Sequence, residues 1–133
     1  MMRTRYDKQL ASHPVLENCS RRELAMLSRH ATGLQLRRGK QLMTPQGAGR
    51  EFLLIKEGKA AVTIGGTKVA ELADGDFCGE MSLLDPVYER KAEVVAETDM
   101  EVFVFDPRGF RQMISEVPFL ADRIRAVAGE RRN

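Results

Sequence analysis

Short runs of β-prone residues separated by glycine-containing turns fill the chain between Leu34 and Asp106. The predicted strands are residues 34–38, 40–43, 51–56, 60–64, 67–72, 91–97 and 100–105. The glycines that punctuate them are Gly39, Gly47, Gly49, Gly58, Gly65, Gly66 and Gly75. Gly65 and Gly66 separate two of the runs and predict a two-residue hairpin. Because no helix separates most of these strands, the pattern favours a closed antiparallel architecture such as a jelly roll over parallel βαβ units.

Helical patterns flank this β-rich region on both sides. Ser20 and Glu23 have the spacing of a capping box, which predicts an amphipathic helix over 21–32 that Gly33 closes. Shorter helical segments are predicted at 6–11 and 13–18. Asp106 and Pro107 predict the start of a C-terminal helix, which Pro118 interrupts before a final helix that ends near Gly129.

The composition is that of one soluble globular domain. The 133 residues are 43% hydrophobic and 30% charged, and they are predicted to form one domain: helical 1–32, a β-roll at 33–106 and C-terminal helices at 107–128. No apolar run is long enough to span a membrane, and the polar N-terminus lacks a signal-peptide pattern, so a cytoplasmic protein is expected.

The cysteines and basic residues each leave two interpretations. Cys19 and Cys78 are best read as reduced, partly buried thiols, although a helix N-terminus beside Cys78 could lower its pKa and permit a redox role.

Basic residues gather at 21–40 and 123–132, and the net charge is +2. Such clusters can mark a nucleic-acid surface, but the absence of interleaved aromatics favours a solvated face.

The segment 77–94 carries the clearest chemical signal. Gly79 allows the backbone to approach a ligand closely, and the helical turn predicted at 79–84 would present free N–H groups to an anion. The Glu80 carboxylate can accept hydrogen bonds from a sugar diol, and the Arg90 guanidinium can bind a phosphate. Together these groups suit a sugar phosphate. The alternative is that Glu80 and Arg90 form an ion pair that only braces the loop.

This segment resembles the phosphate-binding cassette of the cyclic nucleotide-binding domain family, which reads Gly-Glu-Leu/Met-Ser/Ala-Leu, a spacer, and Arg-Ser/Thr/Ala-Ala-x-Val. Here Gly79 begins the first motif and Arg90 begins the second, and the spacer between them is similar to that of the catabolite activator protein. The order of helices, β-roll and C-terminal helices is also similar, from about Leu10 to Val127. The resemblance implies a mainly β fold with flanking helices, an eight-stranded antiparallel β-roll.

The resemblance also implies a ligand and a binding site. Arg90 would pair with the exocyclic phosphate oxygens and Glu80 would accept from the ribose 2′-OH. The implied ligand-binding residues are Gly79, Glu80, Met81, Ser82, Arg90, Lys91 and Ala92. Lys91 stands where the family has Ser, Thr or Ala. It could supply its ammonium to the phosphate, turn outward to pair with Glu89 or Glu93, or crowd the pocket. Because Lys91 lacks the hydroxyl that can bond guanine, cAMP is expected rather than cGMP, with no other cofactor.

The expected function is a stand-alone cyclic nucleotide sensor that signals by repositioning its C-terminal helices. The 28 residues that follow Phe105 are too few for a DNA-binding helix-turn-helix, so the output is expected through a partner protein or a homodimer. The alternative is a β-roll that has lost ligand binding and serves as an interaction or dimerisation module. An enzyme is not expected, because no nucleophile elbow or P-loop occurs and the only histidines, His13 and His30, precede the β-roll.

Overall fold

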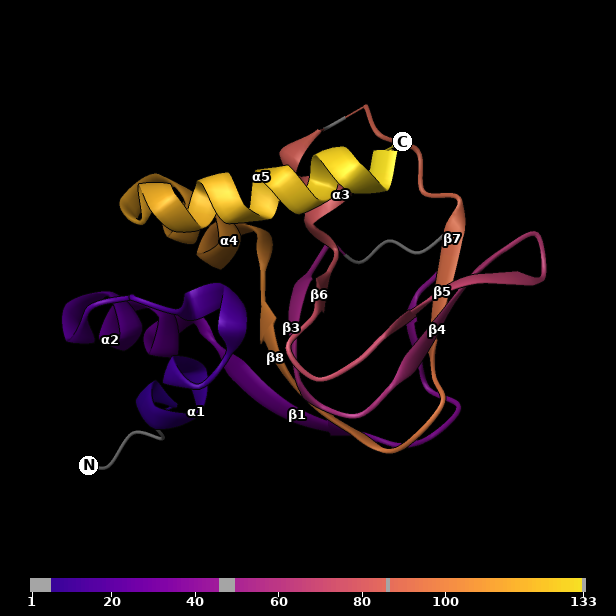
Figure 1. Cartoon of the computed structure of the whole chain (residues 1–133), viewed down its shortest axis with the longest axis horizontal. Helices are drawn as coiled ribbons and strands as arrows, with labels where there is room; N and C mark the ends of the chain where they lie inside the picture. Colours follow the sequence, from indigo (N-terminus) through magenta and orange to yellow (C-terminus); the bar gives the residue numbers. More distant parts are fainter. Residues whose placement is uncertain (1–5, 46–49, 86, 133) are drawn as a thin grey trace.

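In the part of the chain that the structure describes, eight strands pair into two four-stranded antiparallel sheets that form a β-roll (Figure 1). The structure is a computed structural model that describes residues 6–45, 50–85 and 87–132. The first sheet has the order β1 (Thr32–Leu36), β8 (Met100–Phe105), β3 (Phe52–Glu57) and β6 (Phe77–Cys78). The second has the order β2 (Gln41–Met43), β7 (Ala92–Ala96), β4 (Ala60–Ile64) and β5 (Thr67–Leu72). The predicted mainly β fold is confirmed.

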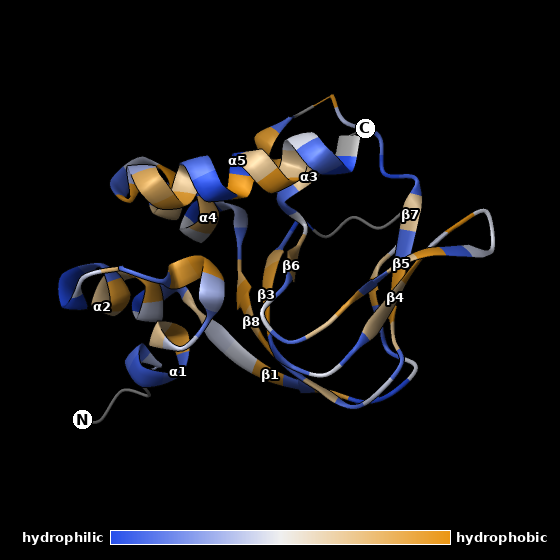
Figure 2. Cartoon of the chain, in the orientation of Figure 1, coloured by the Kyte–Doolittle hydropathy of each residue, from blue (hydrophilic) through white to orange (hydrophobic). Residues whose placement is uncertain are grey.

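The two central strands of the first sheet, β3 and β8, are buried on both faces. Successive side chains of a strand point to opposite faces. Accordingly, Phe52, Leu54, Phe103 and Phe105 face the helices, while Leu53, Ile55, Val102 and Val104 face the second sheet. Figure 2 shows hydrophobic stretches along both strands. The first sheet is therefore the layer shared by two hydrophobic cores, and most residues of its two central strands are buried.

Helices from both ends of the chain cover the outer face of the first sheet (Figure 1). The N-terminal ones are α1 (Asp7–Ala11), the 3₁₀ helix η1 (Pro14–Leu16) and α2 (Arg21–His30). The C-terminal ones are α4 (Pro107–Glu116) and α5 (Pro118–Arg132). Both predicted helix starts are confirmed: Ser20 and Glu23 form the capping box, and the Asp106 side chain accepts from the backbone N–H of Gly109. No helix in the described ranges is both long and apolar enough to cross a membrane.

Two predicted helix ends are wrong, each for a packing reason. Helix α2 ends at His30, and Gly33 instead lies within β1, where it pairs with Phe103. A side chain at Gly33 would come within 3.1 Å of the Tyr6 ring, so this glycine makes room for an aromatic contact. Helix α5 continues past Gly129 to Arg132. An interior glycine costs a helix only about 1 kcal/mol, which tertiary contacts on the same helix can offset.

The β4–β5 hairpin agrees with the prediction, whereas one short strand was not predicted. Gly65 and Gly66 have φ values of 57° and 82°, as a type I′ hairpin between β4 and β5 requires. The omitted strand is β6, whose two residues pair with Leu53 and Leu54 of β3. Two residues carry no periodicity, so only the pairing reveals this strand. Gly47 and Gly49 lie outside the described residues.

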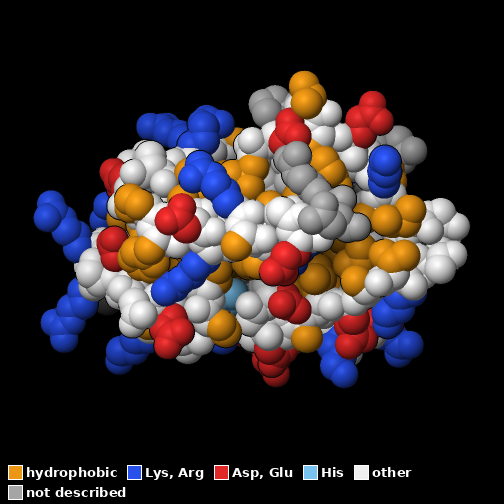
Figure 3. All heavy atoms as spheres, turned by 45° about the horizontal axis from the view of Figure 1, so that its top comes forward, with side chains coloured by type: hydrophobic (Ala, Val, Ile, Leu, Met, Phe, Trp, Pro, Cys, Tyr) orange, Lys and Arg blue, Asp and Glu red, His pale blue; other side chains and the backbone are white. Residues whose placement is uncertain are grey.

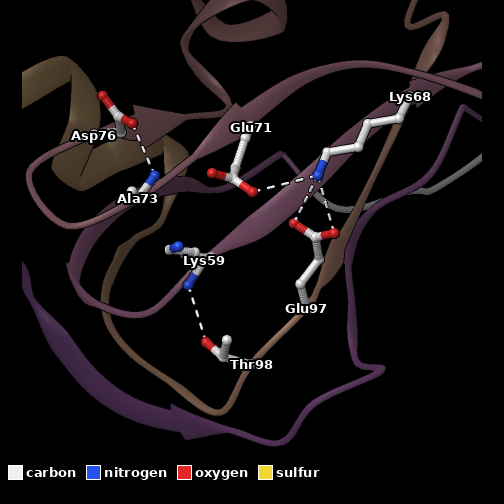
Figure 4. Close-up of polar contacts among 7 residues, drawn as sticks. All are labelled: Lys59, Lys68, Glu71, Ala73, Asp76, Glu97 and Thr98. Carbon is white, nitrogen blue, oxygen red and sulfur yellow. Dashed lines mark hydrogen bonds and ion pairs between the residues drawn. The ribbon is translucent and has the colours of Figure 1, made fainter.

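A surface lysine links two segments of the second sheet (Figure 4). Lys68 Nζ of β5 donates to both carboxylate oxygens of Glu97, at 3.1 and 3.0 Å, and to Glu71 Oε1 at 3.3 Å. The hydrogen bonds to Glu97 and then to Glu71 raise the pKa of Lys68. Since exposed ion pairs contribute little to stability, this cluster fixes local geometry rather than holding the roll together.

His13 joins the N-terminal helices to the β-roll. Its side chain is only 5% exposed, its Nδ1 accepts from the backbone N–H of Val15, and its Nε2 lies 3.2 Å from the carbonyl oxygen of Asp76. Because Nδ1 accepts, Nε2 must carry the proton and donate it to Asp76. Burial lowers the pKa of His13, against the opposing influence of the Asp76 carbonyl and charge. The fold therefore requires the neutral imidazole.

We expect the free energy of unfolding to fall as the pH drops below the ordinary His13 pKa of 6.5. The folded state holds the proton less tightly than the unfolded state, so stability rises with pH through the window just below that value. His13→Asn keeps an acceptor for Val15 without titrating and should reduce this pH dependence, measured by urea unfolding between about pH 5.5 and 7.5. His30→Asn is the matched control and should retain it. Equal pH dependence in the wild type and His13→Asn would contradict the assignment.

Candidate functional site

The loop between β6 and β7 begins with a backbone turn that only glycine permits. Gly79 has φ 95°, and a Cβ at this position would collide with the backbone oxygen of Glu51. Directly after it, residues Glu80–Leu84 form the one-turn helix α3, as predicted for 79–84. The glycine thus brings the start of α3 against β3 and fixes the direction in which Glu80 leaves the backbone.

Glu80 is a fully buried carboxylate with a partner from the far end of the chain. Its Oε1 accepts from Arg131 Nη1 at 2.6 Å, and Arg131 Nη2 donates to the carbonyl oxygen of Phe77 at 2.7 Å. The guanidinium also lies over the Phe77 ring, 5.0 Å from its centroid. Within the described part of the chain, Glu80 Oε2 has no hydrogen-bond partner. The ion pair therefore attaches the last turn of α5 to α3 and leaves one buried acceptor unused.

A cavity of about 290 Å³ lies beside this ion pair. All seven residues predicted from the sequence line it: Gly79, Glu80, Met81, Ser82, Arg90, Lys91 and Ala92. Its remaining lining is mostly apolar and comes largely from the second sheet: Met43, Val62, Ile64, Val69, Ala70, Leu72 and Val94, together with Cys78, Tyr88 and Arg131. The cavity therefore combines an apolar wall with a polar rim, the usual composition of a small-molecule site.

The two cations next to each other in sequence take different positions. Arg90 is half-buried, and its Nη2 donates to Ser82 Oγ at 3.2 Å, so it reaches back to α3 across the loop. Lys91 lines the cavity but is exposed. The alternative prediction, an ion pair between Glu80 and Arg90 that braces the loop, is wrong. Glu80 pairs with Arg131 instead, and Arg90 donates to Ser82. Arg90 is thus held at the polar rim, where an anion would enter.

Arg131 is the site residue that sequence reasoning missed. The predicted final helix ended near Gly129, and Arg131 was not among the predicted site residues. A signal was nevertheless present, because Ile124, Ala128 and Arg131 follow the i, i+4, i+7 spacing of one helix face, and the first two are buried. Continuing that face through Gly129 would have placed Arg131 against the β-roll.

The redox alternative for Cys78 is wrong. Cys78 is buried, and burial, followed by the nearby charge of Glu80, raises the pKa of its thiol to about 12. Burial likewise raises the pKa of Cys19 to about 11. Both cysteines are free thiols, and neither has the lowered pKa that a reactive cysteine needs. Cys78 contributes to the cavity as a small apolar side chain.

Sequence comparison agrees with the geometry. Residues 34–117 match the sequence model of the cyclic nucleotide-binding domain. The chain belongs to this family. The cAMP-dependent protein kinase regulatory subunit of Yarrowia lipolytica is 32% identical over 117 residues, which cover 86% of this chain. The chain spans 31% of that protein's length.

Solved structures show the same fold. The regulatory subunit of a cAMP-independent protein kinase A from Trypanosoma brucei matches with a TM-score of 0.82 at 21% identity, over 93% of this chain and 44% of that one. The catabolite activator protein of Thermus thermophilus matches with a TM-score of 0.73 at 26% identity, over 89% of this chain and 57% of that one. The fold of this chain is thus shared by both of these proteins.

We expect Arg131→Met to lower the free energy of unfolding by about 2–3 kcal/mol, because it leaves the buried Glu80 carboxylate without its cation. The loss should fall below that of a fully buried pair, since the Arg131 side chain is 30% exposed. Urea unfolding measures the change, and adding Glu80→Gln to the variant should recover part of it. Arg125→Met, at an exposed position of the same helix, is the control. Equal effects of the two arginine substitutions would show that the ion pair does not stabilise the fold.

Proposed function

We propose that the chain binds cAMP in the cavity beside α5 and serves as the sensor of a regulatory protein. The observation that carries this proposal is Glu80 Oε2, a buried acceptor unpaired within the described residues that lines the cavity. A buried polar atom without a partner is costly, so the site favours a ligand that brings a donor. The ribose 2′-OH of a cyclic nucleotide is such a donor.

The phosphate would lie at the polar rim. Arg90 would bind its exocyclic oxygens with the fork of its guanidinium, and the Lys91 ammonium could add a further cation. The backbone N–H groups of Met81 and Ser82, in the first turn of α3, would complete the contact, and Gly79 would allow the phosphate to approach the backbone. Together these groups match an anion in charge and in donor capacity.

The purine would then lie against the apolar wall contributed mainly by β4, β5 and β7. We propose cAMP rather than cGMP as the ligand, because the Lys91 side chain lacks the hydroxyl that could form a hydrogen bond with guanine. The Yarrowia relative is named for dependence on cAMP, which supports this choice. The trypanosome protein shares the fold and is named as cAMP-independent, so a β-roll that has lost ligand binding is the alternative.

The signal would pass through Glu80 to α5. One carboxylate oxygen holds Arg131, and the other would accept from the ribose, so the ligand and the helix terminus would share one buried group. A ligand that binds better when α5 is docked shifts the population toward the docked arrangement. The repositioned C-terminal helices would then act on a partner protein or a second copy in the cytoplasm, without any catalytic step in this domain.

We expect Arg90→Ala to weaken cAMP binding at least tenfold, because losing one charged partner typically costs about 2–5 kcal/mol. Isothermal titration calorimetry with cAMP and cGMP measures this. Arg37→Ala, on the turn between β1 and β2 and outside the cavity lining, should bind as the wild type does. Unchanged affinity in Arg90→Ala would reject the proposed pose. If the wild type bound neither nucleotide, the interaction module would be the better assignment.

Hydrogen exchange tests the proposed signal separately from binding. Saturating cAMP should slow amide exchange in the last turn of α5, residues 128–132, because the ligand stabilises the docked helix. Arg131→Met should lose this protection while Arg125→Met keeps it. Binding without any change of exchange in α5 would leave the ligand assignment standing and reject the helix mechanism.

A further inference from the structure

Charge is distributed unevenly along this chain. Residues 50–105, which make up most of the β-roll, contain 12 acidic and 6 basic residues, whereas the rest of the chain contains 7 acidic and 15 basic residues. Figure 3 shows Lys and Arg side chains projecting around the helical end of the molecule, at the left of the view. Within the helical part the excess is concentrated in α2 and α4, which together contain five arginines and two glutamates.

Five exposed arginines on two touching helices form what we call the helical arginine surface: Arg21, Arg22 and Arg29 of α2 with Arg108 and Arg111 of α4. The two helices meet where His30 packs against Gly109, since a Cβ on Gly109 would lie 3.0 Å from that of His30. Arg29 and Arg108 are the sequence neighbours of these contact residues. Arg29 and Arg108 therefore lie next to the junction of the two helices.

The acidic residues of α2 and α4 do not neutralise this surface. The two helices contain only Glu23 and Glu116 as acids. Glu23 accepts from the backbone N–H of Ser20 at 2.8 Å, and Glu116 accepts from Gln112 Nε2 at 2.6 Å. Among the described residues, none of the five arginines forms an ion pair. The surface thus presents several guanidinium groups available for binding.

We propose that the helical arginine surface docks an acidic polypeptide segment of a partner protein. Arginine forks pair bidentately with carboxylates, and the rise of an α-helix spaces Arg22 and Arg29 about 10 Å apart along α2, close to three residues of an extended chain. A lipid surface fits less well, because the apolar residues of both helices, such as Leu27 and Phe110, are buried. Single-stranded nucleic acid fits less well because the exposed large apolar residues of the described chain are aliphatic.

Fluorescence anisotropy with a labelled ten-residue polyglutamate peptide tests this surface directly. The full chain should bind the peptide at about 50 mM salt and more weakly at higher salt. The double variant Arg29→Glu/Arg108→Glu should lose at least tenfold in affinity through like-charge repulsion. The control Arg37→Glu/Arg38→Glu makes the same change in net charge on the β1–β2 turn and should lose less than about threefold, which would support the surface. Titration with cAMP should be unaffected in both variants, so this test is independent of the cavity.

Three outcomes would overturn the proposal. Equal loss in the two double variants would mean that net charge alone attracts the peptide. Tighter binding to a random DNA duplex than to the peptide, lost in Arg29→Glu/Arg108→Glu, would assign the surface to nucleic acid. A wild-type dimer in sedimentation velocity that the same variant dissociates would assign it to a second copy of the chain. Circular dichroism checks that each variant remains folded, which is expected because all the substituted side chains are exposed.

Discussion

The buried ion pair between Glu80 and Arg131 is the contact on which the candidate site depends. A fully buried carboxylate is costly unless a cation and hydrogen bonds compensate it. Here the cation comes from the last turn of α5, 51 residues away in sequence, and the same guanidinium also binds the Phe77 carbonyl. One interaction therefore positions the C-terminal helix, closes one side of the cavity and orients the unused oxygen of Glu80.

The β-roll supplies the rigid frame for this contact. β3 and β8 are packed on both faces, so the strand beside the Gly79 turn cannot shift without disturbing both cores. Gly79 then brings α3 against β3, and the second sheet supplies the apolar wall. The cavity exists because a charged loop is held over an apolar sheet at Gly79, where no side chain is tolerated.

The helical layer connects the two regions that we consider functional. α4 contacts both α2 and α5, so the helical arginine surface and the helix that carries Arg131 belong to one packed unit. A change in the position of α5 would therefore alter the packing of α4. This arrangement gives the proposed sensor a route of contiguous contacts from the cavity to a partner.

Local patterns in the sequence determined the β-rich region and the capped helix starts at Ser20 and Asp106, because these features depend on nearby residues. The resemblance of one contiguous motif to a known family identified all seven predicted residues that line the cavity. Tertiary structure decided the rest. Gly33 lies in a strand because Tyr6 packs over it, β6 exists only through its pairing with β3, and α5 passes Gly129 to place Arg131 on Glu80. Each of these features depends on a contact between residues that are distant in sequence. A local sequence pattern cannot reveal such a contact.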